Sequence, residues 1–184
     1  ANFNANNNTI NNIIITSSTP TNTPGIYTLA VGSSASISGN SITSFIRNHN
    51  AAALTTAAVD LINIQASGTA TFTINNNNIT NNRVNVTTTA GNVVNFNVIK
   101  TNACSGSSIN NNIIRNNGVN ININAGSGVA TVNGISTSGN TGIETITSNI
   151  VKSLFVNTTI PATSTATHVL NGIYSIGGNF SGTK

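Results

Sequence analysis

The sequence carries very little charge and few aromatic side chains. Charged residues are 4% of the 184 positions, with six Lys or Arg against two acids, Asp60 and Glu144, and Met and Trp are absent. Two acids so far apart in sequence are a poor source of the paired carboxylates that glycosidases use. The six cations never adjoin one another or alternate with aromatic side chains, so the basic stripe typical of nucleic-acid-binding proteins is missing. The composition thus argues against both classes.

Cysteine, histidine and long apolar runs are equally scarce. Cys104 is the single cysteine, so no intrachain disulfide or multi-cysteine zinc site can form, and we expect a buried, inert thiol. His49 and His168 stand alone and are predicted to lie in surface loops, without metal or cofactor. The longest apolar run, Ala51 to Leu54, is far too short to span a membrane.

The residues that are abundant favour strands and turns. Asn (37), Thr (28), Ser (20) and Gly (16) supply 101 of the 184 residues, and the apolar residues are mainly Ile (25) and Val (13) against five Leu. Branched side chains pack well on a pleated sheet, whereas Asn, Thr, Ser and Gly are poor in helix interiors. We therefore predict an all-β protein with almost no helix.

An apolar residue, two spacers, an asparagine, one spacer and a second apolar residue recur five times along the chain. The asparagines are separated by 32, 37, 35 and 37 residues, which gives a period of about 35. They are Asn8, Asn40, Asn77, Asn112 and Asn149. The apolar residues that follow them are Ile10, Ile42, Ile79, Ile114 and Val151. A fixed period of this length indicates a stack of similar structural units.

A second strand-like segment follows each asparagine marker. These segments are 25–29, 59–64, 93–98, 132–135 and 171–176, most of them followed by small polar residues. The segments between the two markers vary in length and are predicted to be loops, at 16–24, 48–58, 87–92, 124–130 and 157–167. All three prolines, Pro20, Pro24 and Pro161, fall within them, where a missing backbone donor would not break a strand ladder.

These patterns predict a right-handed parallel β-helix of about five coils of roughly 35 residues, with residues 1–184 forming a single domain. The branched aliphatic residues that follow the markers would form a core ladder. The marker asparagines would stack at a bend, because asparagine tolerates the left-handed backbone conformation and its amide can both donate to and accept from the next coil. Charged residues could not stack in this way without repulsion.

The chain resembles the secreted bacterial proteins built from right-handed parallel β-helix repeats, which share the superfold of pectate lyases. The segments 7–13, 77–82, 132–136 and 171–175 carry the resemblance best. It implies the fold and an extracellular or cell-surface setting, and it implies little about activity, because this superfold includes adhesins, fibres and enzymes.

The sequence offers little support for an enzyme, a crystal-binding surface or a disordered chain. Arg83 and Lys100 could adjoin Asp60 across coils, but we expect a scattered, solvated surface and no catalytic residues. The Thr-x-Thr pairs fall at different phases of the repeat, which argues against a flat threonine array for binding a crystalline surface. Disorder of the asparagine-rich tracts is opposed by 38 regularly placed Ile and Val residues.

We therefore expect a structural, extracellular solenoid of a surface filament or adhesin, with copies of itself or flanking repeats as the partner. The chain starts with Ala, as a processed terminus or an excised segment would, and shows no capping helix at either end. The alternative is a carbohydrate- or surface-binding module of a larger secreted protein, with surface glycans as partner, and less favoured still is a polysaccharide-acting enzyme.

Overall fold

The structure is a computed structural model that describes residues 3–18, 22–31, 34–51, 55–67, 69–88, 92–123, 126–176 and 179–180. All regular elements in these ranges are β-strands, which confirms the all-β prediction. The described residues include no helix long and apolar enough to cross a membrane.

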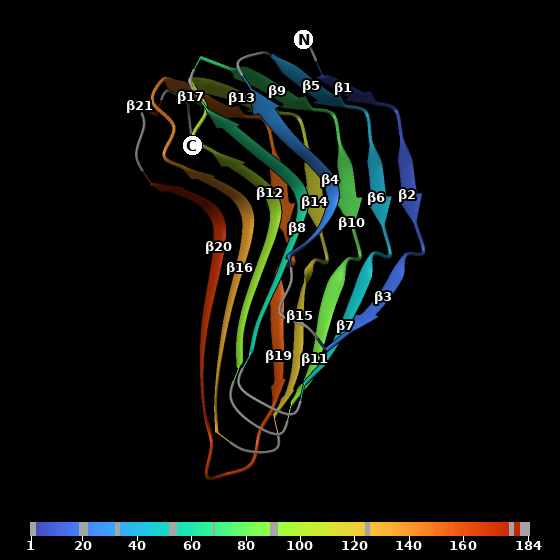
Figure 1. Ribbon diagram of the computed structural model, residues 1–184. Coiled ribbons are helices and arrows are strands. Elements are labelled where there is room, and N and C mark those ends of the chain that lie inside the picture. Colours follow the sequence, from blue (N-terminus) through green and yellow to red (C-terminus); the bar gives the residue numbers. More distant parts are fainter. Residues whose placement is uncertain are drawn as a thin grey trace.

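The strands form four parallel sheets, which we name A to D in the order in which the chain visits them (Figure 1). Sheet A contains β1 (Phe3–Asn6), β5 (Ala35–Ser38), β9 (Thr71–Asn75), β13 (Gly106–Asn110), β17 (Ile143–Thr147) and β21 (Asn179–Phe180). Sheet B contains β2 (Thr9–Asn11), β6 (Ser41–Thr43), β10 (Asn78–Thr80), β14 (Ile113–Arg115) and β18 (Ile150–Lys152). Sheet C contains β3 (Ile14–Ser17), β7 (Ile46–Ala51), β11 (Arg83–Thr88), β15 (Gly118–Ile123) and β19 (Phe155–Thr159). Sheet D contains β4 (Asn22–Val31), β8 (Thr55–Ser67), β12 (Asn92–Asn102), β16 (Ser127–Ser138) and β20 (Thr165–Ile176).

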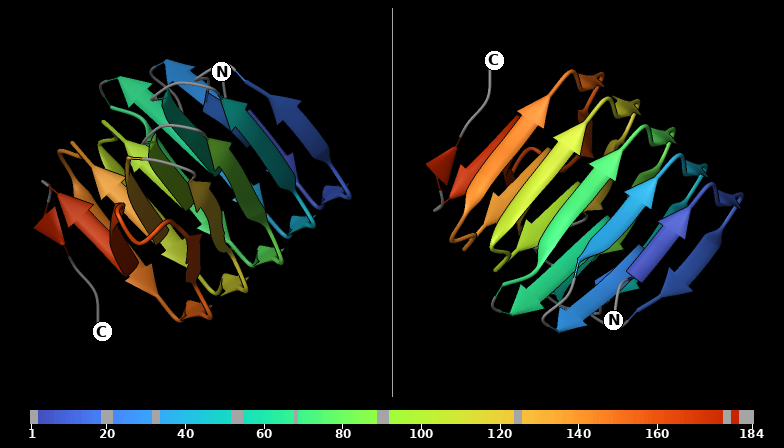
Figure 2. Two further views of the ribbon diagram at one scale, coloured as in Figure 1. Left: turned by 90° about the horizontal axis from the view of Figure 1, so that it is seen from below. Right: turned by 90° about the horizontal axis from the view of Figure 1, so that it is seen from above.

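The chain passes through the four sheets five times and then returns to sheet A with β21. Each strand pairs in parallel with the strand four positions later, so the passes lie on one another as layers, with the blue N-terminal pass at one end and the red C-terminal pass at the other (Figure 2). From β1 in the first pass to β17 in the last, the chain winds through about four full turns. This confirms the parallel β-solenoid, while its right-handed sense stays a prediction.

The core is built from columns of equivalent residues, one from each pass. The strand register places the apolar residues that follow the marker asparagines directly over one another in sheet B. Ile42, Ile79 and Ile114 are fully buried, whereas Ile10 and Val151, in the first and last passes, are half-buried. Stacking therefore buries the middle of each column and leaves its ends incompletely covered.

Sheet D is the longest sheet, and its strands bend along their length (Figure 1). At the bend the pairing register skips one residue in each strand, such as Leu61 in β8 and Val98 in β12, and both side chains are fully buried. The second set of sequence segments lies in this sheet, as expected for strands.

The predicted loops are longer than the observed connections. Strand β7 ends at residue 51 and strand β8 begins at residue 55, so much of the segment 48–58 is paired sheet. Pro24 belongs to β4, the edge strand of sheet D, where its missing N–H breaks no ladder. Pro161 lies in a turn closed by the Ser164 N–H, and Pro20 lies outside the described residues.

Candidate functional site: asparagine ladders and the open ends of the solenoid

The five marker asparagines form one continuous hydrogen-bonded ladder at the turn between sheets A and B. Each donates from Nδ2 to Oδ1 of the next: Asn8 to Asn40 at 2.9 Å, Asn40 to Asn77 at 2.9 Å, Asn77 to Asn112 at 2.8 Å and Asn112 to Asn149 at 2.9 Å. The same Oδ1 atoms also accept the backbone N–H of the preceding asparagine. All donation runs from earlier to later passes, so the ladder has a direction.

The asparagine amides also hold the neighbouring strand. Asn77 Nδ2, for example, donates to the Ile37 carbonyl at 3.0 Å, and the other asparagines after the first repeat this contact. The left-handed backbone, however, belongs to the residue before each ladder asparagine, which corrects our sequence-based explanation. These residues are Asn7, Gly39, Asn76, Asn111 and Ser148, with φ between 54° and 65°.

A second, shorter ladder, which was not predicted from the sequence, lies at the turn between sheets B and C. Asn82 Nδ2 donates to Asn117 Oδ1 at 2.9 Å, and Asn82 Oδ1 accepts the Phe45 N–H at 2.8 Å. Asn82 and Asn117 follow the first-ladder asparagines of their passes by five residues, a spacing that could have revealed them. Here Phe45 and Leu154 occupy the equivalent positions of neighbouring passes, so the ladder ends inside the protein.

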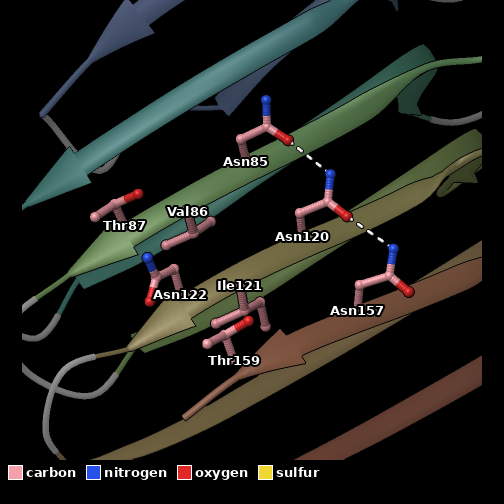
Figure 3. A pocket seen from close by; sticks show the side chains of 8 residues that line it. All are labelled: Asn85, Val86, Thr87, Asn120, Ile121, Asn122, Asn157 and Thr159. Atoms are coloured by element: carbon pink, nitrogen blue, oxygen red, sulfur yellow. Dashed lines mark hydrogen bonds between the residues drawn. The ribbon is translucent and has the colours of Figure 1, made fainter.

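A third ladder lies on the outer face of sheet C. Asn157 donates to Asn120, Asn120 to Asn85 and Asn85 to Asn48, at 2.8 to 2.9 Å. Figure 3 shows three of these amides beside a hollow of about 330 Å³. The second row of side chains along the hollow alternates Thr87, Asn122 and Thr159. No charged side chain lines the hollow, and six of its eight lining residues are Asn or Thr.

A fourth ladder, in sheet D, ends on a carboxylate. Asn171 donates to Asn133, Asn133 to Asn97 and Asn97 to Asp60 Oδ1, at 2.7 to 2.8 Å. The other carboxylate oxygen accepts Asn22 and Asn63 at 2.7 Å and Lys100 at 3.4 Å.

Asp60 is 1% exposed, so the expectation of a solvated surface around it was wrong. Burial of the carboxylate is tolerated because it receives donors from its own strand and from the strands on both sides. Lys100 does adjoin Asp60, as considered from the sequence. Arg83 lies in sheet C and is exposed.

The second acid, Glu144, is buried inside the last pass. Its carboxylate accepts hydrogen bonds from Thr137 at 2.7 Å, Ser175 at 3.1 Å and Asn140. Glu144 belongs to sheet A of the fifth pass and Asp60 to sheet D of the second, so the two carboxylates lie apart. Within the described ranges, no three His, Cys, Asp or Glu side chains come together as a metal site would require.

Cys104 is fully buried, as expected, and it takes the place of a ladder asparagine at the turn between sheets D and A. Its backbone N–H donates to Asn140 Oδ1 at 2.9 Å. Burial raises the pKa of the Cys104 thiol to about 12, and Glu144 adds to this effect. At neutral pH the thiol therefore stays protonated and unreactive.

The histidine predictions were wrong in part. His49 lies in β7 and is fully buried, while His168 lies in β20 and is exposed, with Nε2 2.7 Å from the Thr158 hydroxyl. Arg47, two residues before His49, is also buried and donates to the Thr23 hydroxyl and the Ala58 carbonyl. Burial, and then the charge of Arg47, lower the pKa of His49, which keeps its ring neutral inside the solenoid.

Threonines are also more ordered than the sequence indicated. Thr73 and Thr145 share one outer column of sheet A, with Ser36 and Ser108 in the same column. The Thr-x-Thr pairs that contain them still differ in phase, because Thr147 shares its column with Asn75 and Asn110. Serine interrupts the column of Thr73 and Thr145, so it still differs from a continuous threonine array.

The two ends of the solenoid differ in the groups they expose. In the last pass Leu170 and Ile173 are 50% and 49% exposed, although their column neighbours Val132 and Ile135 are fully buried. In the first pass, Ile26 belongs to the column of Ile173 and is 8% exposed. The C-terminal end thus presents uncovered apolar side chains of the core.

The two tyrosines of the chain lie in a single outer column of sheet D. Tyr27 is in the first pass and Tyr174 in the last, with Asn63, Lys100 and Ser136 between them. Their exposures are 46% and 39%. This column therefore begins and ends with a tyrosine, one at each end of the solenoid.

No family model, no curated protein and no solved structure matches this chain. The ladders and the two ends are therefore the basis for assigning a function.

Proposed function

We propose that this protein is a structural, secreted β-solenoid subunit of a surface filament or adhesin, and that its copies stack end to end. The observation that carries the proposal is the direction of the first asparagine ladder. No described residue donates to Asn8 Oδ1, and the Asn149 N–H has no acceptor among the described residues. An acceptor at one end and a donor at the other are complementary.

This complementarity favours head-to-tail stacking over other arrangements. Placing two N-terminal ends together would bring acceptor against acceptor, whereas Asn149 of one copy can donate to Asn8 of the next and continue the ladder. A head-to-tail contact that does not close on itself generates an open filament. In this arrangement Ile26 of the second copy covers Ile173 of the first.

Charge does not oppose the contact. Lys152 ends an outer column of sheet B that begins with Asn11 in the first pass, so the next copy places an amide rather than a cation beside it. Open strand edges at both ends would otherwise expose unpaired backbone groups. The extracellular setting rests on the resemblance of the sequence to secreted β-helix proteins.

The same arrangement supports a non-enzymatic role. Asp60 and Glu144 lie in different sheets, and side-chain donors of the fold occupy both carboxylates. Their separation leaves no pair that could act on one glycosidic bond.

Sedimentation velocity and electron microscopy of the purified chain test the proposal. We expect rods that lengthen as concentration rises, and we expect Asn8→Ala to lose this behaviour because it removes the acceptor at the N-terminal end. The control is Asn122→Ala, which removes an exposed amide from sheet C in the fourth pass, between the third and fifth passes and away from both ends. A soluble rod that stays monomeric at every concentration would refute the proposal.

The alternative, a glycan-binding surface, is favoured by the neutral hollow on sheet C. Asn120 lies at its centre, and the Phe155 ring lies close against Gly118 on the same face. Amides beside an aromatic ring suit the hydroxyls and apolar faces of an uncharged sugar. Titration with cellohexaose, followed by NMR of the asparagine side-chain amides, would test this role; unchanged Asn85, Asn120 and Asn157 signals would reject it.

A further inference from the structure

The short strand β21 lies where an incoming copy would have to bind. It pairs with β17 through Asn179 opposite Ile143 and Phe180 opposite Glu144. If β2, β3 and β4 of a second copy stack on β18, β19 and β20, its β1 comes to the same edge of β17. The incoming β1 and β21 cannot occupy that edge at the same time, so stacking in continuous register requires β21 to leave it.

The register shows that β1 and β21 are equivalent at this position. A single column of sheet A runs from Phe3 through Ala35, Phe72, Ser107 and Glu144 to Phe180. Both phenylalanines are preceded by asparagine in the sequence, at positions 2 and 179. An incoming β1 would therefore place Phe3 at the register position that Phe180 holds on β17.

We propose that β21 is an exchangeable cap, displaced from β17 by β1 of a second copy when two solenoids join. This inference rests on the proposed end-to-end stacking and adds how the junction forms. Addition of a strand to an open sheet edge is an established mode of protein recognition. The occupant of the edge is then another copy of this chain.

Strand length favours the incoming strand. β21 pairs two residues with β17, whereas the four residues of β1 can each find a partner there, because β1 pairs four residues with β5 in the same columns. Ala5 would extend the buried column of Ile37, Ile74, Ile109 and Ile146. β1 also arrives already paired on its other edge, so little additional ordering is needed.

A reversible disulfide between β21 and β17 tests the exchange. Ile143 and Asn179 are direct partners in neighbouring parallel strands, and Ile143 is 62% exposed, so Ile143→Cys with Asn179→Cys is placed within disulfide reach. With the disulfide formed, we expect loss of assembly in light scattering and sedimentation. Reduction should restore assembly.

The matched control is Ser34→Cys with Thr71→Cys, a pair in the same outer column three passes earlier, whose hydroxyls lie 3.4 Å apart. Its disulfide joins strands that stay paired throughout, so it should leave assembly unchanged. A second variant that ends at Ile176 lacks β21 and should assemble with a shorter lag than the full chain.

The outcomes separate this inference from the proposed function. Normal assembly of the oxidised Ile143/Asn179 pair would show that solenoids stack with β21 in place, and would overturn the exchange while leaving end-to-end stacking intact. Failure of the unmodified chain, the reduced pair and the shortened chain to assemble would overturn both.

Discussion

The turns on either side of sheet B use the same asparagine motif to different extents. At the turn between sheets A and B the ladder includes all five passes, from Asn8 to Asn149. At the turn between sheets B and C it joins Asn82 to Asn117 and is bounded by Phe45 and Leu154. The first ladder is open at both ends, whereas apolar residues close the second.

This difference shows that the asparagine amide is required at the first turn and replaceable at the second. Asparagine is compatible with both turns, but the second turn also accepts a large apolar side chain, so its ladder is replaceable. The first turn keeps asparagine in every pass, including the two that lack a neighbour on one side. We infer that the first ladder sets the register of the stack and can continue into another copy.

The largest expected effect comes from breaking the first ladder at its centre. Asn77→Ala removes the bonds to Ile37 and Asn112 and leaves the Asn40 N–H without its acceptor. Because these groups are buried, we expect the free energy of unfolding to fall by about 3–5 kcal/mol. Guanidinium denaturation followed by circular dichroism measures the change.

The control for this variant is Asn76→Gly at the adjacent exposed position, where φ is 55°. Since glycine adopts this conformation without strain, the free energy of unfolding should change by about 0.5 kcal/mol or less. A similar loss in both variants would show that the turn, rather than the amide, is the stabilising feature.

A smaller effect is expected when the second ladder is replaced. Asn117→Leu copies the residue found in the next pass, so the side chain should fit. The lost bond to the Ile79 carbonyl at 2.8 Å and the lost acceptor for the Asn82 N–H and side-chain amide should together cost about 2–3 kcal/mol. The matched variant Asn112→Leu, in the first ladder of the same pass, should cost more. Equal losses in denaturation experiments would remove the distinction between the two turns.

At the turn between sheets D and A, the backbone conformation of one residue should limit the stability of the protein. Ala103 has φ of 56°, a region unfavourable for alanine, while Gly139 has the equivalent conformation in the next pass. Ala103→Gly should therefore raise the free energy of unfolding by about 0.5–1 kcal/mol. A fall in the melting temperature would show that strain is absent at this turn.

The smallest effect concerns Cys104, which replaces an amide with a thiol at that turn. Its pKa of about 12 is above the ordinary value, so the folded state retains the thiol proton while the unfolded chain loses it above pH 8.5 to 9. The free energy of unfolding should therefore decrease as pH rises from about 9 toward 12, and it should decrease less in Cys104→Ala. Iodoacetamide should label the thiol on unfolding; rapid labelling of the folded protein at pH 9 would contradict the assigned burial.

The repeat spacing predicted the columns well because a parallel stack places equivalent residues in register. Asn77 and Ile79, for instance, lie directly over Asn40 and Ile42, as the common spacing required. The bend of sheet D at Leu61 and the length of the strands could not be read in this way. Both depend on how the four sheets close around the core.

Buried polar residues were the main failure of sequence reasoning. A solvated surface was expected around Asp60 and a surface loop at His49, because charged and ionisable groups are usually exposed. Their partners come from other passes, as Asn97 does for Asp60, and no local pattern indicates them. The second ladder, by contrast, had a detectable signal, since Asn82 and Asn117 share the 35-residue spacing.

Photo-oxidative cross-linking of assembled protein tests the stacking claim most directly. Tyr27 and Tyr174 occupy one column at opposite ends, so head-to-tail stacking brings them onto neighbouring strands about 4.8 Å apart. We predict a dityrosine that joins the Tyr174 peptide of one copy to the Tyr27 peptide of another. Exclusive Tyr27–Tyr27 or Tyr174–Tyr174 products, or none in assembled rods, would contradict the account.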